Sequence, residues 1–345
     1  MNEGQFEHIL DLVQDDLKRK VTQLRKPISA RQRLAICLRF LATGDSYKSF
    51  AYSYRVGKST IVGIVPETCE ILWRKLQPLY MPVPKRKDWE TTAEGFLNRW
   101  QFPNCIGAID GKHVVIQAPP NSGSVFFNYK HTFSVVLMAI VDHMYCFTVI
   151  DVGAFGSCSD GGIFARSQIG RQMDSNELDI PPYQQLPGAP EIGKLPFVAV
   201  GDEAFPLKIN LMRPYPGQHL CEGKRIYNYR LSRARRVVEN AFGILAARWR
   251  IYQRRIQLQP QNVDKIIKAT CALHNFLQKT SQSAQMTQTN ETVNAQESAV
   301  SLQDMQMKGC HASHEAINTR EKFQHYFNSE AGSVPWQRTS CFGNV

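Results

Sequence analysis

Two short apolar runs, each followed by an aspartate, limit what the centre of this 345-residue chain can fold into. The run CIGAID ends at Asp110, and the run FVAVGD ends at Asp202. Between them lie FSVVLMAIV and CFTVIDVG, two further strand-like runs, and then IFARSQIGRQM, a helix-like segment. The last strand can lie parallel beside the first only through a crossover, which the helix supplies. This order predicts an α/β fold with a mixed sheet covered by helices on both faces.

A strongly basic segment follows, from Lys224 to Gln257. It contains ten Lys or Arg and a single carboxylate, Glu239. Its apolar residues fall on one stripe of a helix, which predicts a long helix packed against the sheet; they are Val238, Phe242, Leu245 and Trp249.

Glu239 has two interpretations. In the first, it pairs with Arg235 or Arg236 one helical turn away, and the arginines form a solvated face. In the second, it is a metal ligand beside cations that hold phosphate. The helix alone favours the first interpretation, and the choice depends on whether other carboxylates reach the same place.

The charge of the chain favours a polyanionic partner. The formal net charge is +11, and residues 281–345 carry four Lys or Arg against six acids, so the excess of +13 lies in residues 1–280. Such an excess suits nucleic acid or an anionic membrane. The longest apolar run, Val135 to Val141, is far too short to span a membrane, so nucleic acid is the better match.

The N-terminal part has the spacing of a helix-turn-helix unit. A helix capped by Ser29, a short helix capped by Ser46 and a Gly57 turn precede a third helix, which is expected to be capped by Ser59 and to kink or break at Pro66. The third helix would offer its first residues to phosphate or base edges; these are Lys58, Ser59 and Thr60. A small helical bundle without DNA contact fits the same pattern.

The predicted organisation has five parts. Residues 1–77 form a helical domain with the helix-turn-helix, 78–100 a linker and short helix, 101–280 the sheet domain, 281–316 a disordered polar tether, and 317–345 a C-terminal segment.

Asp110, Asp202 and Glu239 are expected to converge, because the two strands end at a comparable height and the helix crosses the sheet. Three close carboxylates repel unless a cation holds them, and an all-oxygen ligand set suits Mg²⁺ or Mn²⁺. Two such ions can cut a phosphodiester bond. The arginines on the helix would hold the DNA backbone; those selected are Arg233, Arg235, Arg236, Arg248 and Arg250.

Each acid also has a plain structural interpretation. Asp110 with Gly111 could form only a turn, and Glu203 could point inward in place of Asp202. Asp160 and Asp151 compete for a place in the site, and Asp160 could equally cap a helix.

Four sequence blocks resemble, in order, those of the PIF/Harbinger transposase superfamily, including the domesticated Harbinger transposase-derived nucleases of animals. The blocks are GAIDGKH, GSCSDGGIF, VGDEAFPL with MRPYPG, and YNYRLSRARRVVENAFGILAARWRI. The resemblance extends to the N-terminal helical region and to EKFQHYFNSEAGSVPWQ, so it spans nearly the whole chain except residues 282 to about 316.

The resemblance implies a ribonuclease H-like fold and a DDE nuclease whose catalytic, metal-binding acids are Asp110, Asp202 and Glu239. Asp160 and His113, in the shared blocks, are expected just outside the metal ligands. Proteins of this superfamily work with a Myb-like or SANT-type DNA-binding partner that supplies target recognition and nuclear entry. A nuclear and cytoplasmic location is therefore expected. The alternative is a catalytically silent DNA-binding or adapter protein that keeps the transposase fold and works with the Myb-like partner.

Overall fold

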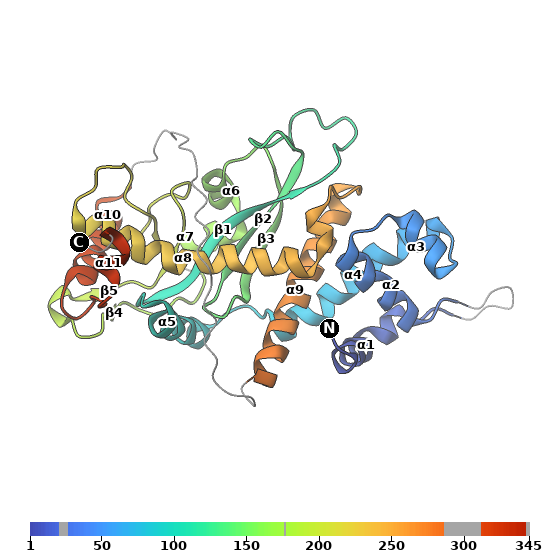
Figure 1. Cartoon of the computed structure of the whole chain (residues 1–345), viewed down its shortest axis with the longest axis horizontal. Helices are drawn as coiled ribbons and strands as arrows, with labels where there is room; N and C mark the ends of the chain where they lie inside the picture. The colour runs from blue at the N-terminus through green and yellow to red at the C-terminus, as the bar shows by residue number, and fades with distance from the viewer. Residues whose placement is uncertain (21–26, 176, 286–311, 343–345) are drawn as a thin grey trace.

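The protein is known as a computed structural model that describes residues 1–20, 27–175, 177–285 and 312–342. Most of the predicted tether, residues 286–311, lies outside the described residues. A mixed sheet forms the centre, with helices on both faces (Figure 1). Among the described residues, none of the helices combines the length and apolar character that crossing a membrane requires.

The central sheet has the strand order β3-β2-β1-β6-β7. The strands β1 (Cys105–Val115), β2 (Ser134–Val141) and β3 (Phe147–Phe155) form antiparallel neighbours, as the apolar runs predict. The short strand β6 (Val198–Val200) pairs parallel with β1, and β7 (Leu211–Met212) pairs parallel with β6. The mixed sheet is therefore confirmed.

Two small strand pairings were not predicted. The strand β7 lies in a segment expected to be a loop, and β4 (Gln184–Gln185) forms a small separate sheet with β5 (Lys194–Leu195). Each of these strands has two residues, which is too short for a periodicity of two to be visible.

The first strand continues past the predicted end at Asp110. β1 runs on to Val115 because β2 pairs with it along this second half, from Ala108 opposite Val141 to Val115 opposite Ser134. The prediction that the strand ends at Asp110 is wrong, and so is the turn interpretation of Asp110 and Gly111.

Different helices cover the two faces of the sheet. The long helices α8 (Glu222–Arg248) and α9 (Pro260–Gln285) pack on one face, and α8 crosses β1, β2 and β6 (Figure 1). The short helices α6 (Asp160–Arg166) and α7 (Gln168–Asp174) pack on the other. The predicted single helix is split at Ser167, whose side chain caps α7 by accepting from the Gly170 amide.

The N-terminal helices pack together and against α9. They are α1 (Glu3–Leu17), α2 (Ala30–Thr43), α3 (Tyr47–Tyr54) and α4 (Lys58–Tyr80), followed by α5 (Arg86–Trp100), which packs on β1. The predicted caps Ser29 and Ser46 are confirmed by their hydrogen bonds to the amides three residues on, and α2 stops at Gly44, whose φ is +66°.

The expected cap of α4 is wrong, because its N-cap is Gly57 rather than Ser59. Of the expected kink or break at Pro66, the break does not occur, since the helix continues to Tyr80. Proline removes one helical hydrogen bond. Pro66 is buried among apolar residues of α4 that pack against α2 and α9, so tertiary packing offsets this loss.

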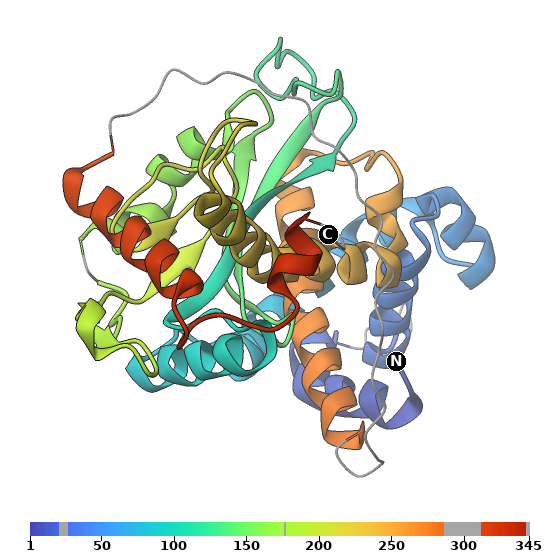
Figure 2. The same cartoon turned by 60° about the vertical axis from the view of Figure 1, so that its left-hand side comes forward.

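The C-terminal segment folds back onto the first half of α8 (Figure 2). It contains α10 (His314–Asn328) and α11 (Gln337–Phe342), and both helices pack against α8. The 3₁₀ helix η2 (Arg250–Gln253) follows the other end of α8. Arg230 of α8 holds this arrangement. Its side chain is 2% exposed and donates to the Gly332 carbonyl (3.0 Å), the Gln337 Oε1 (2.8 Å) and the Gln101 carbonyl.

Arg230→Ala should therefore destabilise the protein by about 2 to 4 kcal/mol, because it leaves three buried acceptors without their charged donor. Arg236→Ala on the exposed side of the same helix is the matched control and should change the free energy of unfolding by less than about 0.5 kcal/mol. Chemical denaturation of both variants measures this difference. Equal stabilities would contradict the structural role of Arg230.

Candidate active site

Asp110 and Asp202 lie at the same height in the sheet. In the parallel pairing of β1 with β6, Ala108 is the partner of Val200, and each aspartate comes two residues later. β6 ends at Val200, so Asp202 lies just beyond the end of that strand. Asp110 still lies within β1, which continues past the end of β6. The register brings two of the three predicted acids to one height. Among the described residues, however, no three His, Cys, Asp or Glu side chains are close enough together to hold a metal ion, so the predicted convergence of all three acids is not seen.

The carboxylates of this region are held close enough to disturb one another. Burial, and then the negative charge of Asp202, raises the pKa of the Asp110 carboxyl to about 7. Burial also raises the pKa of Asp202, against the opposing effect of Arg235. A free carboxyl of this kind has a pKa near 4, so the metal-free site favours partial protonation of Asp110 at neutral pH.

Asp160 is a fourth acid of the site. It is the first residue of α6, while Ser159 caps that helix, so the cap interpretation of Asp160 is wrong. Its Oδ1 is buried without a hydrogen-bond partner, and burial followed by the charge of Asp202 raises the pKa of Asp160 to about 6. The Asp160 carboxylate lies close to the backbone of Gly111, which has no side chain. A Cβ at that position would lie 2.3 Å from Asp160 Oδ1.

Two competing acids lie elsewhere. Glu203 is exposed, whereas Asp202 is partly buried and its Oδ1 accepts from the Ala204 amide (2.9 Å). Asp151 of β3 accepts from the Gln168 amide (2.8 Å) at the start of α7. The inward acid after β6 is therefore Asp202.

Glu239 reaches this region from α8, and it is paired with Arg235. The two side chains are 2.7 Å apart at i, i+4, with Arg235 17% exposed and Glu239 43% exposed. The first interpretation of Glu239 is confirmed, because it pairs with Arg235. Its charge also raises the pKa of Asp202, but its role as a metal ligand stays a prediction. Besides pairing with Glu239, Arg235 acts on the two aspartates, because its positive charge opposes the rise in pKa of both Asp110 and Asp202; these four residues and Asp160 are called the acid cluster.

A pocket of about 330 Å³ opens between Asp110 and Glu239. Its wall includes Lys112 and Lys130, two cations that were not predicted from the sequence as site residues. Lys112 stands two residues after Asp110 in β1, so the alternation of the strand was a signal that could have identified it.

His113 lies on the wall of the same pocket. Its Nδ1 is 2.9 Å from Ser134 Oγ, and burial followed by the charge of Lys130 lowers its pKa to about 4. The imidazole is therefore neutral at pH 7.

The five selected arginines differ in their surroundings. Arg236 and Arg250 are exposed, and Arg235 belongs to the acid cluster. The Arg233 guanidinium lies 3.9 Å from the centre of the Trp336 ring, and Arg248 donates to Gln278 Oε1 (3.3 Å). DNA contact by these residues stays a prediction, and Arg236 and Arg250 are the most accessible of them.

The surroundings of Asp110 generate a pH-dependent prediction. A carboxyl whose pKa is higher in the folded than in the unfolded state stabilises the fold at low pH, and that stability is lost as pH rises from about 4 to about 7. Without divalent metal, Asp110→Asn should melt above the wild type at pH 8, by on the order of 2 °C, and the difference should shrink toward pH 4.

Calorimetry at both pH values measures this effect, and Asp151→Asn outside the cluster is the control. If Asp110→Asn melts at or below the melting temperature of the wild type at pH 8, then burial and the charge of Asp202 do not destabilise the charged form of Asp110.

Comparisons with known proteins place the site in a family. Residues 109–275 match the DDE superfamily endonuclease family model. The chain is 26% identical to the Arabidopsis thaliana protein named "Protein ALP1-like" over 289 residues, which cover 79% of this chain and 67% of that protein. It is 24% identical to the mouse protein named "Putative nuclease HARBI1" over 259 residues, which cover 74% and 69%.

No solved structure matches the chain. The matched segment begins one residue before Asp110 and includes Asp160, Asp202 and Glu239. DDE superfamily endonucleases generally use divalent metals. The mixed sheet flanked by helices is consistent with their ribonuclease H-like fold. The resemblance predicted from the sequence is confirmed: residues 109–275 match the DDE superfamily endonuclease family, and the relatives of the chain include proteins named "Protein ALP1-like" and "Putative nuclease HARBI1".

Proposed function

We propose that this protein is a transposase-derived endonuclease that hydrolyses DNA phosphodiester bonds with two Mg²⁺ or Mn²⁺ ions held by Asp110, Asp202 and Glu239. The observation that carries the proposal is the β1–β6 register, which brings Asp110 and Asp202 to the same height in a segment that matches the DDE superfamily endonuclease family. The positive charge of residues 1–280 supports DNA as the substrate.

The residues of the site fit a hard divalent cation in their chemistry. All four acids offer oxygen ligands, which Mg²⁺ and Mn²⁺ prefer, and Asp160 Oδ1 is a buried acceptor without a partner. Burial, and then the charge of Asp202, raises the pKa of both Asp110 and Asp160, and a bound cation would favour the charged form of both. When bound, such ions activate a water molecule and stabilise the leaving oxygen of the phosphodiester.

The side chains around the acids have separable roles in this proposal. Arg235 balances the acid cluster and holds Glu239, so Glu239 becomes available as a ligand only when this ion pair opens. Lys112 and Lys130 place positive charge on the pocket wall, where it attracts the phosphate backbone. Asp160 lies behind Gly111 and adds negative charge next to Asp202.

Asp202→Asn should reduce Mg²⁺- or Mn²⁺-dependent cleavage of DNA by at least about 100-fold, because a metal ligand is lost while the fold is kept. Glu203→Gln is the matched control, since it removes the adjacent but exposed carboxylate and should keep cleavage within about twofold of the wild type.

Gel assays of plasmid nicking, with EDTA as a further control, measure both variants. Cleavage that persists in Asp202→Asn, or that needs no metal, would contradict the proposal.

A second candidate is a DNA-binding or adapter protein that keeps the fold without cutting, together with a Myb-like partner. One observation favours it: across the described ranges, no three His, Cys, Asp or Glu side chains lie close enough together to hold a metal ion. Glu239 is correspondingly occupied by Arg235. In this case DNA binding depends on salt but not on the acids.

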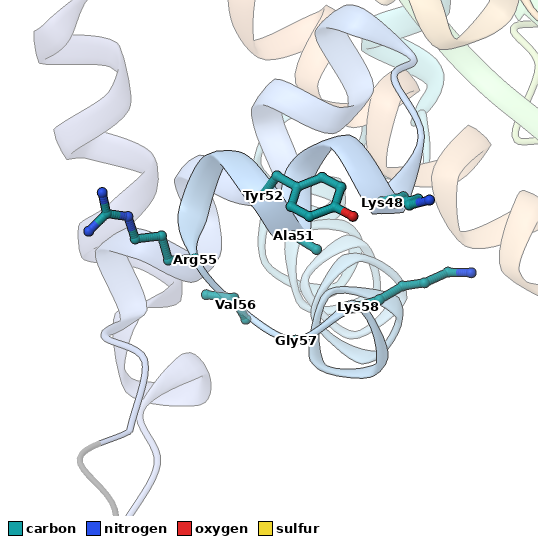
Figure 3. Close-up of a pocket in the computed structure, with 7 residues that line it drawn as sticks. All are labelled: Lys48, Ala51, Tyr52, Arg55, Val56, Gly57 and Lys58. Carbon is teal, nitrogen blue, oxygen red and sulfur yellow. The ribbon is translucent and has the colours of Figure 1, made fainter.

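We propose that both candidates use the same N-terminal DNA contact, in which α2, α3 and α4 act as the predicted helix-turn-helix. The turn before α4 borders a pocket of about 500 Å³ whose wall includes Lys48, Tyr52 and Lys58. In Figure 3 the side chains of Lys48 and Lys58 extend toward the same side, and Arg55 points away from both. Ser59 and the Lys58 amine are exposed at the first turn of α4, where backbone N–H groups favour phosphate.

Lys58→Gln should therefore weaken DNA binding by a similar factor for all sequences and lower the slope of log K against log salt by about 1, as expected for one lost phosphate contact. Fluorescence anisotropy over a salt series measures the slope. Lys194→Gln, an exposed lysine in the small β4–β5 sheet, is the control. An unchanged slope in Lys58→Gln would remove α4 from the DNA contact.

A further inference from the structure

The loop between β1 and β2 presents an aromatic side chain beside the acids. Tyr129 is 58% exposed, and it lines the same pocket as Asp110 and Glu239. The loop extends well beyond the body of the sheet (Figure 1). Neighbouring side chains of the loop, Val125 and Phe127, are also exposed, so this part of the surface is unusually apolar for one next to a cluster of charges.

The loop is held rigidly around Tyr129. The Asn128 side chain is 3% exposed, and its Oδ1 accepts from the amides of Lys130 (3.0 Å) and Thr132 (3.1 Å). Its Nδ2 donates to Ser134 Oγ (2.8 Å), which also contacts His113. The Asn128 side chain thus holds the backbone on which Tyr129 stands. Little conformational entropy of the loop would therefore be lost when a ligand packs against Tyr129.

The groups around the pocket differ from one end to the other. The Tyr129 ring packs edge-on against the His113 ring, with centroids 5.5 Å apart, and the Lys130 amine is 5.3 Å from the Tyr129 ring centre. The Lys112 amine lies 5.8 Å from the centre of the Phe242 ring, and Asp110 and Glu239 line the same pocket. An aromatic surface suits a nucleobase, and nearby amines suit a phosphate.

The size of the pocket limits what can enter. Its volume of about 330 Å³ is at the lower end for small-molecule sites, so the interior has room for a single nucleotide and not for a base pair. In the interior of a duplex, moreover, both faces of each base are stacked on neighbouring bases, so an interior base can offer a face to Tyr129 only when it is unpaired.

We propose that this pocket binds one unpaired nucleotide of the DNA strand next to the bond that is cut, with its base against Tyr129 and its phosphate near Lys130 and Lys112. The inference rests on the proposed nuclease function, because it assigns the substrate strand at the same site. It makes DNA with unpaired nucleotides, at an end or in a distorted duplex, the preferred ligand over an intact blunt duplex.

The test compares two labelled DNAs of equal paired length, one blunt and one with a short single-stranded overhang. Fluorescence anisotropy with the full-length protein in EDTA measures affinity without cleavage, at one fixed salt concentration. The variants are Tyr129→Ala, Tyr129→Phe, which keeps the ring, and Lys130→Gln. Tyr183→Ala is the control, because Tyr183 is also exposed (47%) but does not line this pocket. Circular dichroism melting checks that each variant is folded.

Tyr129→Ala should weaken binding of the overhang DNA by about 5- to 100-fold, the range for loss of one base–aromatic stack. It should leave the blunt duplex within about twofold, and Tyr129→Phe should restore the overhang affinity. The fluorescence of 2-aminopurine in the overhang should be quenched by the wild type and by Tyr129→Phe, but not by Tyr129→Ala.

An equal effect of Tyr129→Ala on both DNAs, or no effect on either, would overturn the inference. Failure of the proposed nuclease function looks different: the wild type would bind the overhang through Tyr129 and yet cut no DNA with Mg²⁺ or Mn²⁺.

Discussion

The parallel pairing of β1 with β6 is the constraint on which the rest of the site depends. Because Ala108 lies beside Val200, the two aspartates that follow at equal spacing are brought to one height, although they stand far apart in the sequence. A register shift of one residue would send one of them to the opposite face of the sheet. The continuation of β1 beyond β6 is equally important, since it supplies Gly111, which admits Asp160, and Lys112, which borders the pocket.

Helix α8 serves two structural purposes along its length. Its first half holds the C-terminal segment through the buried Arg230, whose pKa burial lowers to about 10 without removing its charge at neutral pH. Its middle supplies Arg235 and Glu239 to the acid cluster. A basic helix can therefore be rich in arginine without offering most of that charge to a ligand, because a guanidinium can donate to several carbonyls or stack on an aromatic ring. Accessible charge of this basic segment remains on Arg236, Arg250, Arg254 and Arg255, and Lys130 adds exposed charge at the pocket.

The sheet and its acids could be predicted because they follow long, clear patterns. The runs that form β1, β2, β3 and β6 are apolar over enough residues to be identified, and the crossover rule then fixes the parallel pair. The short strands β4, β5 and β7 lack such a pattern. The true end of β1 was not predicted, because Gly111 and the polar residues after it interrupt the apolar pattern, whereas pairing with β2 extends the strand to Val115. The helix α4 continues through Pro66 because of tertiary packing, which the sequence pattern does not show. The pairing of Glu239 with Arg235 was foreseen as one alternative. The places of Lys130 and Tyr129 depend on a loop conformation fixed by the buried Asn128, which spacing in the sequence does not reveal.

Anomalous diffraction from crystals soaked in Mn²⁺ tests metal binding by this acid cluster most directly. The proposed function predicts anomalous density within about 2.0 to 2.3 Å of carboxylate oxygens of both Asp110 and Asp202. It also predicts that Glu239 has left Arg235. The same experiment on Asp202→Asn crystals should lose the density. Density absent from the site at saturating Mn²⁺, with Arg235 still bound to Glu239, would contradict a metal-dependent nuclease and leave the DNA-binding alternative in its place.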